Sequence, residues 1–60
     1  MNTALIEINQ YLDLAWGKLD CAANVSYNEG YASIQMQVSR LQLEILRIQS
    51  EIEDKEYGDE

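Results

Sequence analysis

Hydrophobic residues recur along most of this chain at alternating intervals of three and four positions, the spacing of one face of an α-helix. In the first half of the chain these positions are Leu5, Ile8, Leu12, Ala15, Leu19 and Ala22, with Trp16 beside them. In the second half they are Tyr27, Tyr31, Ile34, Val38, Leu41, Ile45, Ile48 and Ile52. The pattern predicts two helices, at about residues 3–23 and 27–55, of the heptad type found in coiled coils.

The segment NVSYNEG separates the two patterns and predicts a turn at about residues 24–26. Ser26 followed by Glu29 has the spacing of a capping box, which would open the second helix and place Gly30 in its first turn. We therefore expect residues 1–57 to form one all-α domain, an antiparallel two-helix hairpin. An acidic tail would follow at residues 58–60.

A turn at this place makes the second helix longer than the first. Leu5 would lie opposite Ile45, and Ile52 would extend past the end of the first helix, with its side chain in water. Two hairpins packed side by side as a four-helix bundle would cover that end. We therefore expect a homodimer, with self-association through Leu41, Ile45, Ile48 and Ile52.

The second helix also carries apolar residues on the side opposite its main stripe. Met36 and Leu43 project there, with Leu46 at the edge of the same strip. Three interpretations are open: copies of the same chain bury these residues, a different protein binds them, or they are simply exposed. On the first helix, Leu14 faces away from the main stripe, and Tyr11 is a candidate exposed anchor for a partner protein.

A chain of 60 residues buries a small core, and small domains are commonly stabilised by disulfides, metals or association. The single cysteine, Cys21, excludes an internal disulfide, and the chain has no histidine for a zinc site. We expect no metal and no cofactor, so association remains. The sequence begins without the basic region of a signal peptide and has no apolar run of membrane-spanning length, which favours a cytoplasmic protein.

Eleven acidic residues against four basic ones give a net charge of -7. This charge favours a protein partner with a basic surface over nucleic acid or anionic lipid. Glu53, Asp54 and Glu56 concentrate negative charge near the C-terminus. Two interpretations remain open for them: a solvated, solubilising end, or carboxylates that imitate phosphates in a groove that binds nucleic acid.

The residues of this chain provide little evidence for catalysis. Cys21 has only Asp20 and Lys18 near it, and neither is an obvious base that would activate a thiol as a nucleophile. Arg40 and Arg47 stand two helical turns apart, but nearby glutamates can pair with them, so a direct nucleic-acid role is disfavoured. We expect a protein that is not an enzyme.

In size, acidity and lack of catalytic groups, the chain resembles the small proteins that phages and plasmids use against host machinery, including anti-CRISPR and anti-restriction inhibitors. The resemblance implies an inhibitor, viral if phage-encoded, that occludes a basic, nucleic-acid-binding site on a protein in the host cytoplasm. One alternative is a structural or assembly protein that self-associates as a helical bundle. The other is a hairpin-dimer nucleic-acid regulator, similar in architecture alone to the plasmid RNA-binding hairpins.

Overall fold

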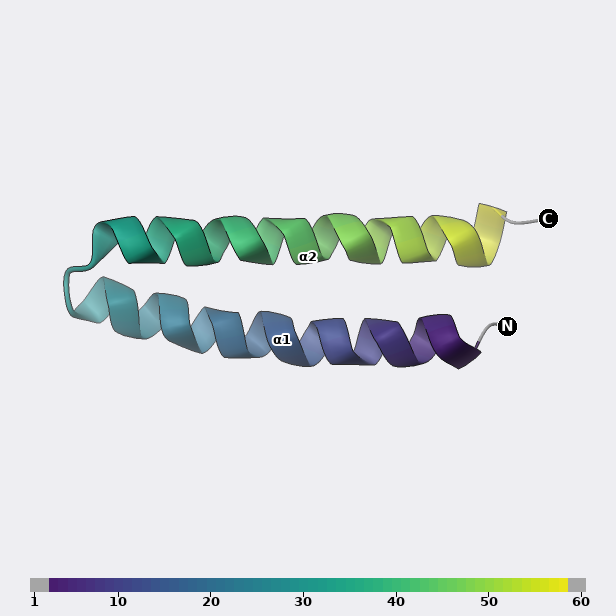
Figure 1. Cartoon of the computed structure of the whole chain (residues 1–60), viewed down its shortest axis with the longest axis horizontal. Coiled ribbons are helices and arrows are strands. Elements are labelled where there is room, and N and C mark those ends of the chain that lie inside the picture. The colour runs from purple at the N-terminus through teal and green to yellow at the C-terminus, as the bar shows by residue number, and fades with distance from the viewer. Residues whose placement is uncertain (1–2, 59–60) are drawn as a thin grey trace.

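The computed structural model describes the backbone of residues 3–58 and the side chains of residues 3–55. The described residues form two α-helices, α1 (Thr3–Asn28) and α2 (Ala32–Gly58). The helices run antiparallel and pack side by side, with the turn at one end and the start of α1 beside the end of α2 at the other (Figure 1). The prediction of an all-α hairpin is confirmed.

The turn is a Schellman motif built around Gly30. This glycine has a φ of 80°, in the left-handed region that residues with a Cβ rarely adopt. The Gly30 N–H donates to the carbonyl of Tyr27 at 3.1 Å, and the Tyr31 N–H donates to the carbonyl of Ser26 at 2.8 Å. These bonds satisfy carbonyls that the end of a helix leaves free. Together with the left-handed conformation of Gly30, they end α1 at this point.

The predicted turn at residues 24–26 is wrong, because these residues belong to α1. Ser26 is buried in the last turns of α1, where its Oγ donates to the carbonyl of Ala22 at 2.8 Å and caps no helix. Gly30 supplies the left-handed stop a few residues later. It therefore ends α1 instead of lying in the first turn of the second helix.

The later turn makes the two helices nearly equal, with 26 residues in α1 and 27 in α2. Two glutamines of α2 define how the helices are aligned. The Gln42 Nε2 donates to the carbonyl of Trp16 at 3.2 Å, and the Gln49 Nε2 donates to the Asp13 Oδ1 at 2.7 Å.

This alignment contradicts the predicted overhang of α2. Leu5 does not lie opposite Ile45, since Asp13 is already level with Gln49. Ile52 is covered by the hairpin itself and is only 7% exposed. An uncovered end of α2 is therefore no longer an argument for a second hairpin.

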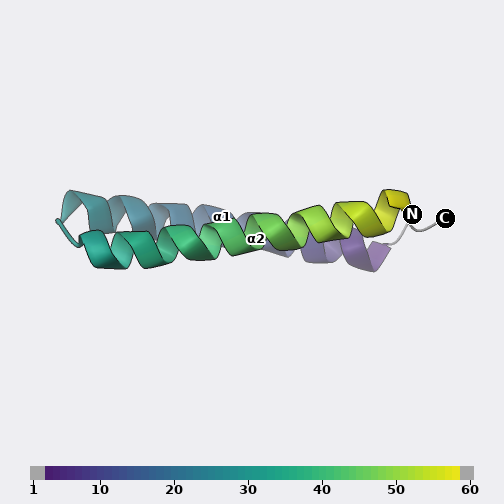
Figure 2. The ribbon, with the colours of Figure 1, turned by 90° about the horizontal axis from the view of Figure 1, so that it is seen from above.

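The hairpin is a slender rod with extents of 48 × 15 × 9 Å. Its radius of gyration is 14.1 Å, against about 10 Å for a compact chain of this length. Seen from above, the two helices cross at a shallow angle (Figure 2). Two helices alone cannot surround a core, so most side chains remain at the surface.

Candidate protein-interaction surfaces

The helices meet along a seam of side chains that are buried or half-buried. From α1 the seam contains Leu5, Asn9, Leu12, Trp16, Leu19, Ala23 and Ser26, and from α2 it contains Gln35, Val38, Gln42, Ile45, Gln49 and Ile52. Among the described hydrophobic residues, only Ala23, Ile45 and Ile52 are buried. The seam is thus partly polar and its apolar core is small.

The seam is displaced from the stripes that the sequence pattern predicts. It includes Asn9, Trp16 and three of the four glutamines of α2, which the predicted stripes leave out. Tyr27 and Tyr31, placed in the predicted stripe, are exposed instead. Tyr27 falls in the last turn of α1 and Tyr31 in the turn itself, so neither belongs to the helical pattern of α2.

Hydrogen bonds line one side of the seam, which we call the polar side. Asp13 and Asp20 of α1 lie there, one helical repeat of seven residues apart. Asp13 accepts from Gln49, and Asp20 accepts from the Gln42 Nε2 at 3.4 Å. Hydrogen bonds to ionised carboxylates are stronger than neutral ones, so this side joins the two helices through polar contacts.

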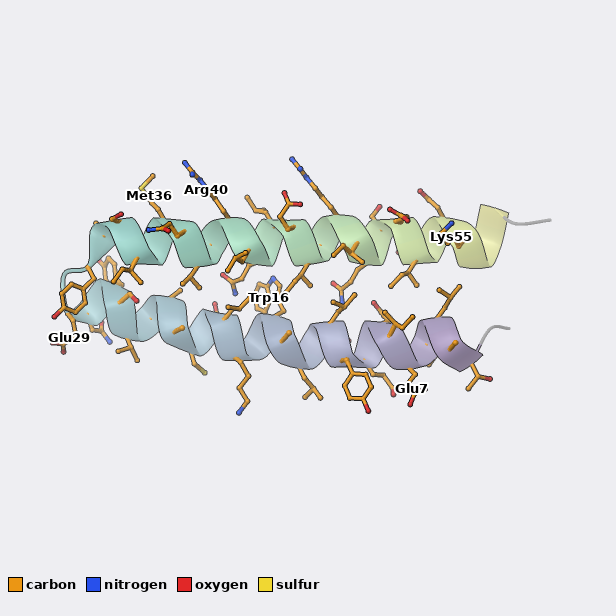
Figure 3. The ribbon with its side chains drawn as sticks, in the orientation of Figure 1. Glu7, Trp16, Glu29, Met36, Arg40 and Lys55 are labelled. Carbon is orange, nitrogen blue, oxygen red and sulfur yellow. The ribbon has the colours of Figure 1, made fainter. Side chains whose placement is uncertain are left out.

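Trp16 lies between the two helices at mid-length (Figure 3). Its carbonyl accepts from Gln42, but its indole Nε1 is buried with no hydrogen-bond partner among the described residues. The Oδ1 of Asn9, one heptad earlier, is buried in the same way. An unpaired buried polar atom costs about 1–3 kcal/mol, so these groups weaken the seam.

The opposite side of the seam is aliphatic, and we call it the apolar side. It consists of the residues that directly precede seam positions: Ile8, Ala15 and Ala22 of α1, and Ile34, Leu41 and Ile48 of α2. In an antiparallel pair of right-handed helices, residues in these two rows lie on the same side of the pair. All six are exposed, which leaves an apolar surface that spans both helices.

The outer strip of α2, formed by Met36, Leu43 and Leu46, lies on the other flank of that helix. All three side chains are exposed, and Met36 points away from α1 (Figure 3). By helical spacing, Leu41 and Leu43 project about 160° apart around α2, so the outer strip and the apolar side are separate surfaces.

The predicted self-association residues divide into two pairs. Ile45 and Ile52 are buried against α1 within a single hairpin, at 8% and 7% exposure. Leu41 and Ile48 belong to the apolar side and remain exposed. A second copy of the folded hairpin can therefore contact Leu41 and Ile48 but not the other pair.

Tyr11 and Leu14, the predicted partner-binding residues of α1, are both exposed. Helical spacing from Trp16 places Leu14 on the face of α1 that points away from α2. The whole hairpin lies between these side chains and the outer strip of α2. The structure therefore does not combine them with Met36 and Leu43 into one patch.

Acidic residues near the end of α2 are exposed, including Glu53 and Asp54. The side chain of Glu56 lies outside the described residues, as do Asp59 and Glu60 of the predicted tail, whereas Gly58 ends α2. Arg47 is paired with Glu44 at 3.0 Å on the exposed surface of α2. This pairing partly neutralises the pair of arginines that a phosphate contact would need.

The predicted stripes did not separate the apolar side from the seam, although α2 contains a signal for this division. Three times, at intervals of seven residues, an aliphatic residue is followed directly by glutamine: Ile34–Gln35, Leu41–Gln42 and Ile48–Gln49. The predicted stripes combined such aliphatic residues with true seam residues. In both helices, the stripe is therefore centred between the seam and the apolar side.

Other chemical features of the described residues are few. Cys21 is an exposed free thiol. Within residues 3–58, no group of three or more His, Cys, Asp or Glu side chains could hold a metal ion, and neither helix combines the length and hydropathy needed to span a bilayer. Comparison of the chain with protein families, curated proteins and solved structures finds no match.

Proposed function

We propose that this chain is a non-catalytic protein-interaction module that binds a partner protein through the outer strip of α2. The observation that supports the proposal is the exposure of Met36, Leu43 and Leu46 on a helix whose contact with α1 is already complete. Exposed apolar residues that gather on one flank of a helix are typical of binding surfaces. Since the hairpin does not use this strip, a partner can bind it without unfolding.

The charge of the chain supports a partner with a basic surface. The net charge is -7, and Glu53 and Asp54 are exposed beyond the outer strip. Such a surface steers association with a basic protein and repels nucleic acid. Inhibition of a nucleic-acid-binding protein by occlusion of its basic site, as in phage and plasmid inhibitors, is the specific form of this function that we propose.

Self-association as a four-helix bundle is the second part of the proposal. It is supported by the exposed apolar side, an observation independent of the outer strip. A structural or assembly role would use this surface alone. The inhibitor role would use it to present two outer strips in one dimer.

The partner-binding proposal is tested with tagged wild-type chain, Leu43→Glu and Ser33→Glu in pull-downs from the native host at several salt concentrations. Ser33 is an exposed polar residue at the start of α2, beside the Met36 end of the outer strip, so its variant adds the same charge without removing an apolar side chain. We expect one protein with a basic surface to bind the wild type and Ser33→Glu, to be lost with Leu43→Glu, and to bind more weakly at high salt. Equal recovery with all three chains would contradict a role for the outer strip.

A further inference from the structure

The apolar stripes of both helices point toward the same flank of the hairpin. Each stripe is centred between the seam and the apolar side, so about half of its aliphatic residues face water in the single hairpin. In a four-helix bundle, each helix directs its stripe toward the bundle axis, between its two neighbours. Both helices therefore have the rotation about their own axes that a four-helix bundle requires. An isolated hairpin does not require this rotation.

The elongated hairpin exposes more surface than a compact monomer of its mass. The accessible area is 4917 Å², whereas a compact monomer of the same mass has about 4000 Å². The difference, about 900 Å², is close to the roughly 800 Å² that each partner buries in an interface of standard size.

The two rows of the apolar side have complementary relief. Gln42 hydrogen-bonds to α1 at Trp16 and Asp20, so Lys18 is level with Gln42 and Ala15 is level with Ile45. Ala15 therefore lies level with the interval between Leu41 and Ile48. If α1 of one copy packs on α2 of another with the turns at the same end, the small alanines meet the gaps between large aliphatic side chains.

The charges at the edges of the apolar side favour the same arrangement. Lys18 borders the row of α1, and Glu44 borders the row of α2 within half a helical turn of the same level. With the turns at the same end, each Lys18 lies near Glu44 of the other copy, whose carboxylate also pairs with Arg47 of its own helix at 3.0 Å. With the turns at opposite ends and α1 packed on α1, Lys18 would instead approach its own symmetry mate, a repulsive contact.

We propose that the apolar side is covered by a second copy of this chain, with α1 of each hairpin packed on α2 of the other and both turns at the same end. This assignment rests on the self-association proposed above and specifies the surface and the geometry. Ile8, Leu41 and Ile48 make the apolar contacts, and two Lys18–Glu44 pairs set the orientation. The outer strip of α2 remains free in this dimer.

The surface is tested by light scattering and circular dichroism on the wild type, Leu41→Glu and Leu43→Glu. The two leucines are matched controls, since they are 53% and 59% exposed and lie two positions apart on α2. We expect a dimeric wild type, a dimeric Leu43→Glu, and a Leu41→Glu whose dimerisation is weaker by more than about a hundredfold. A monomeric wild type would overturn self-association itself and leave the apolar side to a foreign protein, whereas a dimer lost only in Leu43→Glu would overturn the choice of surface alone.

The orientation is tested by charge reversal, which changes exposed residues and leaves the seam intact. Lys18→Glu alone should weaken the dimer about three- to tenfold at low salt, and adding Glu44→Lys should restore part of the loss, because Glu44→Lys also removes the ion pair with Arg47 within the hairpin. The reversal also keeps the proposal testable if Leu41→Glu unfolds. A Lys18→Glu variant that dimerises as well as the wild type would overturn the same-end arrangement.

Discussion

On the polar side of the hairpin, Gln42 and Gln49 of α2 bind two aspartates of α1; on the apolar side, Leu41 and Ile48 occupy the preceding positions and face water. Side chains one residue apart on a helix project about 100° apart, so this small step separates the two chemistries completely. The seam contains glutamine side chains at positions where aliphatic side chains would stabilise an isolated pair of helices most. The polar side thus joins the two helices, whereas the apolar side is available for a second molecule.

Polar residues in a helical seam commonly fix register and partner number at a cost in stability. The hydrogen bonds from Gln42 and Gln49 are specific for one alignment of α1 and α2, which apolar contacts alone would not determine as strictly. The aliphatic residues beside them are not specific for a single alignment. They supply the area by which a bundle could gain the stability that the seam lacks.

The largest effect should come from exchanging the neighbours in all three aliphatic–glutamine pairs, which preserves composition and charge. The substitutions are Ile34→Gln, Gln35→Ile, Leu41→Gln, Gln42→Leu, Ile48→Gln and Gln49→Ile. Burial of three aliphatic side chains, less the hydrogen bonds lost, should raise the unfolding free energy of the single hairpin by about 3 kcal/mol. Self-association should disappear.

Denaturant unfolding followed by circular dichroism at several protein concentrations measures both effects of the exchange. The midpoint for the wild type should rise with protein concentration, as expected for a dimer. The midpoint for the exchanged chain should be higher at low concentration and independent of concentration. If it stays concentration-dependent, the apolar side is not the association surface.

A smaller effect is expected at the turn, which determines which residues enter the seam. Gly30→Ala should lower the unfolding free energy by about 1–2 kcal/mol, because a Cβ is strained at its φ of 80°. Gly17→Ala is the matched control: Gly17 lies within α1, and an added Cβ there meets open space. Thermal unfolding should show stabilisation of up to about 1 kcal/mol for that variant, so the same substitution should have opposite signs at the two sites.

The smallest effect concerns one contact of the polar side. Gln49→Ala removes the 2.7 Å hydrogen bond to Asp13 and should lower the unfolding free energy by about 1 kcal/mol. Arg47→Ala removes an exposed ion pair with Glu44 and should change the unfolding free energy by less than about 0.5 kcal/mol. If the two variants lose equal stability in denaturant titrations, the polar side contributes no more than an ordinary surface ion pair.

The hairpin itself was predictable because spacings of three and four extend through both halves of the chain. The position of the turn was not, since the spacing of Ser26 and Glu29 also fits a capping box. A serine hydroxyl can equally bond back to a carbonyl four residues earlier, as Ser26 does with Ala22. Only the conformation of Gly30 decides between these alternatives.

The phase of the seam was also beyond the sequence pattern. Val38 and Ile45 repeat every seven residues, and so do Leu41 and Ile48, so one stripe contains both the residues that face α1 and those that face water. When the turn is predicted at the wrong residues, the predicted alignment of the two helices is wrong as well. The predicted exposure of Ile52 is wrong for the same reason. By contrast, Met36, Leu43 and Leu46 lie outside the seam, as their position opposite the main stripe indicates, and they are exposed in the single hairpin.

Because α1 begins and α2 ends at the same end of a rod 48 Å long, the molecule has one end suited to attachment (Figure 1). A linker, fluorophore or sensor surface joined at either helix end would lie at the same end of the rod, with Gly30 at the far tip (Figure 1). Neither attachment would cover the long flanks. Immobilised in this way, the chain would remain open to lateral binding along its whole length.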